Sequence, residues 1–167
     1  MPTKIRTCVM VALCALAPLA ARAQSDDIQI AFAEQFAKGL TDARWTTKLL
    51  KLQEKSAVDS ALNYGKQLFA LAGGANSEWK PSVRHDSTFL TAQGRKFGVV
   101  NASLTMDSSS IQSDSTIAVT AVRVMGIVGK NLVSVGCLRA SDKPISVSAG
   151  PCAAAIRKAF GVGISSI

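Results

Sequence analysis

Few side chains in this sequence have the chemistry of a catalyst. Histidine is the usual general base near neutral pH, and the chain contains one, His85, in a polar stretch with Arg84 and Asp86. A hydrolase or transferase built on His85 would need a serine hydroxyl folded next to the imidazole. No Gly-x-Ser-x-Gly nucleophile motif is present. His85 is therefore the one catalytic candidate, and we expect it on a solvent-exposed loop.

The segment Ser77-Glu78-Trp79-Lys80 matches the Ser-x-x-Lys pattern of serine acyltransferases that act on cell-wall peptides. The context argues against that chemistry, because Pro81 disfavours a helical conformation at Lys80. We interpret the match as a coincidence. Trp79 is instead our candidate binding residue, since exposed tryptophans are enriched at binding hot spots. The alternative for Trp79 is partial packing against the sheet.

The sequence predicts neither a metal site nor a cofactor. A zinc site needs imidazole or thiolate ligands, and one histidine with two oxidised cysteines cannot supply them. Asp107 and Asp114 flank a serine-rich segment without the Asp-x-Asp-x-Asp-Gly pattern of a calcium loop. The segment from Gly126 to Asn131 is two residues too short between its glycines for a phosphate-binding loop, and we interpret it as a turn.

The first 23 residues have the organisation of a cleavable secretory signal. Lys4 and Arg6 precede an uncharged apolar run over residues 8–20, and Ala21-Arg22-Ala23 offers small residues for cleavage before Gln24. The run is shorter than the ~20 residues that a membrane-spanning helix needs, so we expect no permanent membrane anchor. An uncleaved anchor is the alternative. This N-terminus is typical of a periplasmic protein of a Gram-negative bacterium, and secretion into the medium is also open.

Two cysteines, Cys137 and Cys152, remain after removal of the signal, which carries Cys8 and Cys14. An even pair in an oxidising compartment indicates a disulfide bond. Redox-active pairs usually lie two residues apart, so we expect a structural disulfide.

The composition of residues 24–167 fits a single domain with one hydrophobic core. This part has 16 Lys and Arg against 11 Asp and Glu, which gives a net charge of +5, because the signal holds three basic residues and no acidic one. The cations are scattered, whereas nucleic-acid-binding surfaces show clustered basic residues interleaved with aromatics. We therefore expect no nucleic acid as partner. An envelope protein or an anionic envelope component fits the charge better.

Hydrophobic periodicity predicts helices before and after a set of strands. Ile28, Phe32, Phe36 and Leu40 recur every four residues and favour a helix over 28–40. Residues 45–52 fit a helix or a strand, and we favour the helix. Ser56 and Asp59 form a capping arrangement that predicts a helix start, and Gly73-Gly74 predicts its end. A loop over 75–85 follows.

The second half of the chain favours strands. We expect strands over 87–92, 97–106, 117–128 and 132–139, and then a helix with Pro151 at its first position and Gly161 at its end. Strands 117–128 and 132–139 are apolar at nearly every position, so both faces of their sheet should be covered. Arg123 is the exception, and we expect it at a sheet edge or a bulge.

These elements predict one α+β domain over residues 24–167, with N-terminal amphipathic helices and an antiparallel sheet of about 4–5 strands. The disulfide should tie the C-terminal helix to the last long strand. We expect a non-enzymatic binding or accessory protein of the cell envelope. The alternatives are a small hydrolase or transferase that uses His85 and a distant serine, and a carrier of a lipid or other apolar ligand.

Overall fold

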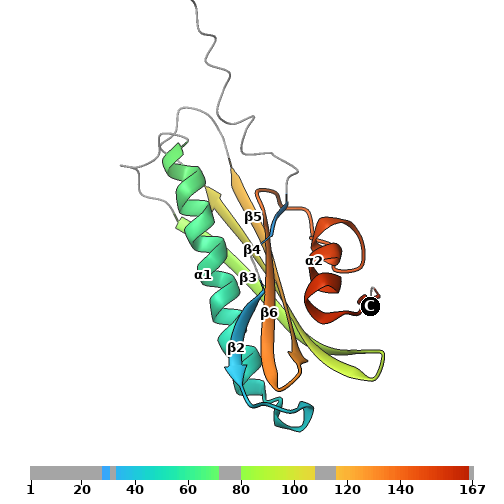
Figure 1. The fold of residues 1–167 in the computed structure, drawn as a ribbon. Helices are drawn as coiled ribbons and strands as arrows, with labels where there is room; N and C mark the ends of the chain where they lie inside the picture. The colour runs from blue at the N-terminus through green and yellow to red at the C-terminus, as the bar shows by residue number, and fades with distance from the viewer. Residues whose placement is uncertain (1–27, 31–32, 72–79, 108–115, 166–167) are drawn as a thin grey trace, which may run out of the picture.

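The structure is a computed structural model that describes residues 28–30, 33–71, 80–107 and 116–165. An antiparallel sheet lies between a long helix on one face and a short helix on the other (Figure 1). The elements in chain order are β1 (Ile28–Ile30), β2 (Glu34–Lys38), a 3-10 turn (Asp42–Arg44), α1 (Thr47–Leu71), β3 (Lys80–Ala92), β4 (Arg95–Asp107), β5 (Ile117–Val128), β6 (Asn131–Arg139) and α2 (Gly150–Phe160). The predicted α+β class is confirmed.

The strands follow the order β1-β6-β5-β4-β3, and every pair is antiparallel. β2 also pairs with β6, next to Asn131–Ser134, while β1 pairs with Cys137–Arg139 further along the same strand. The sheet is therefore five strands wide although six strands form it. Two-residue turns at Gln93-Gly94 and Gly129-Lys130 join β3 to β4 and β5 to β6. These hairpins explain why strands close in sequence lie side by side.

The helix predicted over residues 28–40 is wrong, because the described part of this segment forms β1 and β2. A spacing of four residues places side chains on one face of a helix, but it also places them on one face of a strand, whose period is two. The edge of β6 supplies hydrogen-bond partners for a strand at this position. That tertiary pairing decides between the two structures.

Residues 47–52 are helical, as we favoured, and belong to α1, which runs from Thr47 to Leu71 without a break. Ser56 therefore lies inside a helix and does not cap one. Its backbone carbonyl accepts a hydrogen bond from Ser60, and Asp59 forms an ion pair with Lys55 at 2.6 Å. The predicted stop at Gly73-Gly74 lies outside the described residues.

The loop predicted over residues 75–85 is wrong for its second half, since β3 begins at Lys80 and includes Pro81 and His85. Pairing with β4 continues over the whole length of β3, from Lys80 opposite Asp107 to Ala92 opposite Arg95. A proline is tolerated in a strand at the edge of a sheet, where its missing N–H is not needed for pairing. β3 is such an edge strand.

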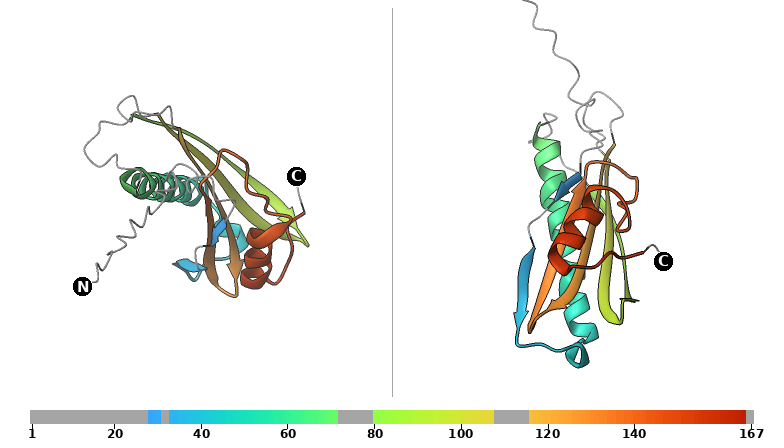
Figure 2. Two further views of the ribbon diagram at one scale, coloured as in Figure 1. Left: turned by 90° about the horizontal axis from the view of Figure 1, so that it is seen from above. Right: turned by 45° about the vertical axis from the view of Figure 1, so that its right-hand side comes forward.

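A helix packs on each face of the sheet, as predicted (Figure 2). α1 packs on one face over Val100, Leu104 and Met125, all buried. α2 packs on the other face, where Phe97 and Ile156 are fully buried. Alternate side chains of β4 and β5 thus enter two different apolar layers, which explains their nearly continuous hydrophobic sequences.

The predicted tie between α2 and the last long strand is confirmed by a disulfide between Cys137 of β6 and Cys152 of α2. Pro151 lies in the first turn of α2, where its missing N–H has no helical partner to lose. Gly161 ends the helix with a positive φ of 72°, and its N–H bonds to the carbonyl of Arg157.

A buried hydrogen bond joins α1 to β6. The Ser134 hydroxyl donates to Oε1 of Gln53 at 2.7 Å, and both side chains are buried. We expect Gln53→Leu to lower the free energy of unfolding by about 2 kcal/mol, because it leaves the Ser134 hydroxyl buried without this partner. Adding Ser134→Ala should restore most of that loss. Urea unfolding of the two variants tests this, and equal stabilities for them would contradict it.

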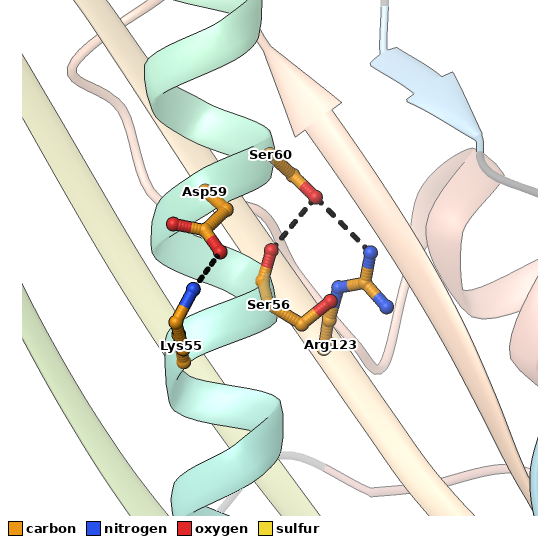
Figure 3. A network of polar contacts seen from close by, with 5 residues as sticks. All are labelled: Lys55, Ser56, Asp59, Ser60 and Arg123. Atoms are coloured by element: carbon orange, nitrogen blue, oxygen red, sulfur yellow. Dashed lines mark hydrogen bonds and ion pairs between the residues drawn. The ribbon is translucent and has the colours of Figure 1, made fainter.

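Arg123 lies at neither of the places we expected. β5 is an interior strand, and its register with β4 and β6 is continuous around Arg123. The half-buried guanidinium points toward α1 and donates to Ser60 Oγ at 3.1 Å (Figure 3). Burial lowers the pKa of Arg123, and the nearby charge of Glu34 acts in the opposite direction. Because α1 supplies a polar partner, a cation is accommodated in an otherwise apolar strand.

Candidate functional site: the free edge of β3

β3 is the last strand of the sheet, and within the described residues no strand pairs with its outer side. The strand has 13 residues, which is long for an edge strand, since such strands are often kept short to prevent unwanted pairing. The opposite edge of the sheet is formed by two much shorter strands, β1 with 3 residues and β2 with 5, which both pair with β6. β3 is therefore the longer edge of the sheet in the described residues, and we call its outer side the open edge.

The β3–β4 turn determines which backbone groups of β3 point outward. Gln93 and Gly94 have φ angles of 50° and 71°, as a type I′ hairpin turn requires. The residues that flank a two-residue turn, here Ala92 and Arg95, exchange both backbone hydrogen bonds, and bonded and non-bonded pairs then alternate along the hairpin. The outward N–H groups consequently belong to Val83, His85, Ser87, Phe89 and Thr91.

The same residues turn their side chains toward the α1 face. Val83 and Phe89 pack against the apolar layer under α1. The Ser87 hydroxyl donates to Glu54 of α1. The free backbone groups of β3 and the side chains that face α1 therefore share one surface, and a strand added to this edge would contact both.

A depression of about 420 Å³ lies between α1 and β3 on this side. Lys51, Glu54, Lys55 and Val58 of α1 line it together with Val83 and His85 of β3. We call this depression the α1 groove. It combines two apolar residues, Val58 and Val83, with charged side chains of α1, which suits an extended polypeptide.

The charge of the α1 groove is predominantly positive. Lys51 and Lys55 are exposed on α1, and Lys55 forms an ion pair with the exposed Asp59, an interaction of the kind that contributes little in water. Glu54 is the acidic residue of the groove, and it accepts the Ser87 hydroxyl. At the hairpin end, Lys96 holds its ammonium 4.1 Å from the centre of the Phe89 ring. Three ammonium groups thus border the open edge.

His85, the predicted catalytic candidate, is exposed in β3 and not on a loop. Within the described residues, no hydrogen bond joins its imidazole to a serine hydroxyl or to a carboxylate. Ser87, two residues further along β3, is engaged by Glu54. The geometry that would favour base activation of a nucleophile is therefore not seen at His85.

The other predicted residues divide into two groups. Cys137 and Cys152 form the expected disulfide. Trp79, Ser77 and Asp114 lie outside the described residues. Among the residues that the structure describes, no cluster of three or more His, Cys, Asp or Glu side chains could hold a metal ion.

Sequence reasoning missed the edge strand, although one signal was available. We predicted a loop over the segment that contains Pro81, but proline inside a strand-forming stretch also indicates an edge strand. The side chains after Pro81 alternate between the two faces of the sheet, with Val83 and His85 toward α1 and Arg84 on the other face. Because both faces carry polar side chains, the sequence does not show the alternation of apolar and polar residues by which a strand is recognised.

No helix in the described ranges is long and apolar enough to cross a membrane. Comparisons of the chain with protein-family models, with curated proteins and with solved structures found no match. The candidate site therefore rests on its own geometry.

Proposed function

We propose that this is an exported, non-enzymatic binding protein of the cell envelope, which accepts an extended segment of another protein on the free edge of β3. The observation that supports the proposal is the row of five outward N–H groups on one long strand, whose outer side has no partner strand in the described residues. Addition of a strand to such an edge is a recurring mode of protein recognition, in which backbone hydrogen bonds supply affinity and alternate side chains supply specificity.

The α1 groove indicates the chemistry of the bound segment. In an added strand, every second side chain would face α1, near Lys51, Lys55 and Lys96. Acidic side chains at these positions would be attracted to the ammonium groups, and small or apolar ones would fit beside Val83. We infer a segment with alternating acidic residues, and we expect its binding to weaken with added salt because the lysines are exposed.

Two features support export. The N-terminal residues have the charged, apolar and small-residue order of a secretory signal. The Cys137–Cys152 disulfide fits an oxidising compartment. The full chain should therefore be expressed for export in a Gram-negative host, and the recovered protein used in each experiment below, with its N-terminus read from its intact mass.

Hydrogen exchange of single amides tests the open edge and its occupation. In the free protein, we expect the amides of Val83, His85 and Ser87 to exchange much faster than those of Arg84 and Asp86, because only the latter bond to β4. Acidic 12-residue peptides selected from a displayed random library should slow the exchange of the first three. Slow exchange at these amides without peptide would contradict an open edge.

His85→Pro removes one outward N–H and no bond to β4, so we expect it to weaken peptide binding at least ~10-fold, with little effect on folding. His85→Thr keeps the N–H and removes the imidazole, and it should bind within a few-fold of the unaltered protein. Equal losses in the two variants would mean that the imidazole is recognised and would overturn strand addition. A library that yields no peptide protecting β3 would also overturn it.

A further inference from the structure

The sheet face under α2 changes from apolar to polar along β4. Phe97 and Val99 are buried beneath α2, whereas Asn101 and Ser103, further along the same face, are only half-buried. On the opposite face, β4 stays apolar to its end, with Leu104 and Met106 buried under α1. The polar half is thus confined to the part of the face that α2 leaves uncovered.

A second depression, of about 480 Å³, occupies this uncovered half. Side chains of β3, β4 and β5 form its floor, and the loop after β6 forms one wall. We call it the polar depression, and the polar residues that line it are Arg84, His85, Asp86, Asn101, Ser103, Thr120 and Asp142. Its volume lies within the range of small-molecule binding sites.

The wall of the polar depression is held in place. Thr120 donates from its hydroxyl to the carbonyl of Ser141 at 2.7 Å, and the Ser141 hydroxyl accepts the N–H of Lys143 at 3.1 Å. Ile145 is buried in the α2 layer, and the disulfide closes the same loop. The site therefore exists before any ligand arrives, which lowers the entropic cost of binding.

Most polar groups of the depression are available to a ligand. Within the described residues, the side chains of Arg84, Asp86, Asn101, Ser103 and Asp142 form no hydrogen bond or ion pair with one another or with other residues. Elsewhere in the molecule, half-buried polar side chains such as Arg95 and Ser60 are engaged. Thr120 is the member of the depression that is already bonded.

The types of these groups define the class of ligand. A carboxylate, an amide and a guanidinium can each form two hydrogen bonds in one plane, which matches neighbouring hydroxyls on a ring. One cation, Arg84, stands against two anions, Asp86 and Asp142, so an anionic ligand gains no net attraction. We infer that the polar depression binds an uncharged, polyhydroxylated ligand, of the size of a mono- or disaccharide.

This site is tested separately from the proposed strand-binding edge. Arg84 and Asp86 direct their side chains to the α2 face and their backbone groups to β4, whereas the α1 groove uses alternate residues of β3. His85 lines both depressions, so the test uses Asn101, which lines the polar depression alone. Failure of peptide binding would therefore leave the inference standing, and failure of sugar binding would leave the proposed function standing.

NMR titration of the exported protein with glucose, N-acetylglucosamine and maltose, up to tens of millimolar, tests the inference. We expect at least one sugar to shift the amides of Asn101, Ser103 and Thr120. Asn101→Ala should weaken this binding at least ~10-fold by removing two hydrogen bonds. Thr105→Ala, on the same face of β4 but outside the depression, is the matched control and should bind normally.

Inorganic phosphate is the competing probe. Shifts at these amides with phosphate and with none of the sugars would overturn the inference, since the site would then select an anion. An absence of shifts with every sugar, or sugar binding that Asn101→Ala leaves unchanged, would overturn it as well. Equal thermal unfolding of Asn101→Ala and the unaltered protein checks that any loss is not a folding defect.

Discussion

Phe97→Ala is expected to lower the free energy of unfolding by about 3–5 kcal/mol, the usual cost of removing a large buried aromatic side chain. Phe97 is fully buried, and its ring meets that of Phe160 edge to face at 5.3 Å between centroids. Gly126 of β5 leaves the space into which the ring fits, because a methyl group there would lie 2.6 Å from it. The substitution thus leaves a cavity at the centre of the α2 layer.

The loss of stability should be larger than the buried apolar area alone suggests, because the Phe97 ring also supports two hydrogen bonds of the Arg95 side chain. The Arg95 guanidinium lies 5.3 Å from the centre of the Phe97 ring and donates to the carbonyls of Phe160 and Ile127 at 2.7 and 2.6 Å. These bonds join the ends of β4, β5 and α2. Without the ring beside it, the guanidinium is held less firmly in the orientation in which it forms these hydrogen bonds.

Urea unfolding of the oxidised protein measures the effect. Phe97→Leu is the matched control, since it keeps most of the apolar volume and should cost about 1–2 kcal/mol. A loss below that of Phe97→Leu, or no difference between the two, would mean that the ring does not organise the α2 layer.

Reduction of the disulfide is expected to lower the free energy of unfolding by about 3 kcal/mol. Cys137 and Cys152 are 15 residues apart. In the chain-entropy model, closing a loop of this length lowers the conformational entropy of the unfolded chain, and this stabilises the folded state by about 3 kcal/mol. The native state should persist after reduction, because Ile156 and Phe160 still bury α2 against the sheet. We therefore expect a lower unfolding midpoint and a conserved fold.

Urea unfolding with and without dithiothreitol gives the measurement. The double variant Cys137→Ala with Cys152→Ala provides the control for the reagent, since its stability should not respond to it. An unchanged midpoint for the reduced unaltered protein would contradict the prediction.

The disulfide also closes the loop that forms the wall of the polar depression. If reduction displaces this loop, sugar binding should become weaker.

The two proposed sites use the two faces of the same edge region. β3 provides backbone groups to a strand beside the α1 groove and side chains to a ligand in the polar depression. Side chains alternate along a strand, so most residues of this 13-residue strand face one partner or the other, while His85 lines both depressions. Variants at residues that line one depression alone, such as Asn101, are therefore the ones that separate the two sites in experiments.

Local sequence was sufficient for the elements whose signals lie within a few residues. The turn predicted at Gly129-Lys130-Asn131, between a long β-branched run and a second apolar run, indicated the β5–β6 hairpin. Pro151 and Gly161 marked the two ends of α2, since their backbone preferences act at the helix termini. The cysteine count and the expected compartment predicted the disulfide.

Local sequence failed where a distant partner decides the structure. Residues 28–40 have apolar side chains every four positions, and the pattern fits helix and strand alike. Pairing with β6 makes residues 28–30 and 34–38 strands. Ser56 has the local pattern of a helix cap, yet α1 already begins at Thr47, because its apolar face continues along the sheet from Leu50 to Phe69.

The sequence by itself determined the class of fold, the disulfide and the segments that form the hairpin and the C-terminal helix, because turn residues, caps and cysteines act locally. Only the tertiary structure decided that the short strands β1 and β2 form one edge of the sheet and the long strand β3 forms the other. Strand order depends on pairing between segments far apart in the chain, and hydrophobic periodicity carries no information about it. The free edge and the polar depression follow from that order.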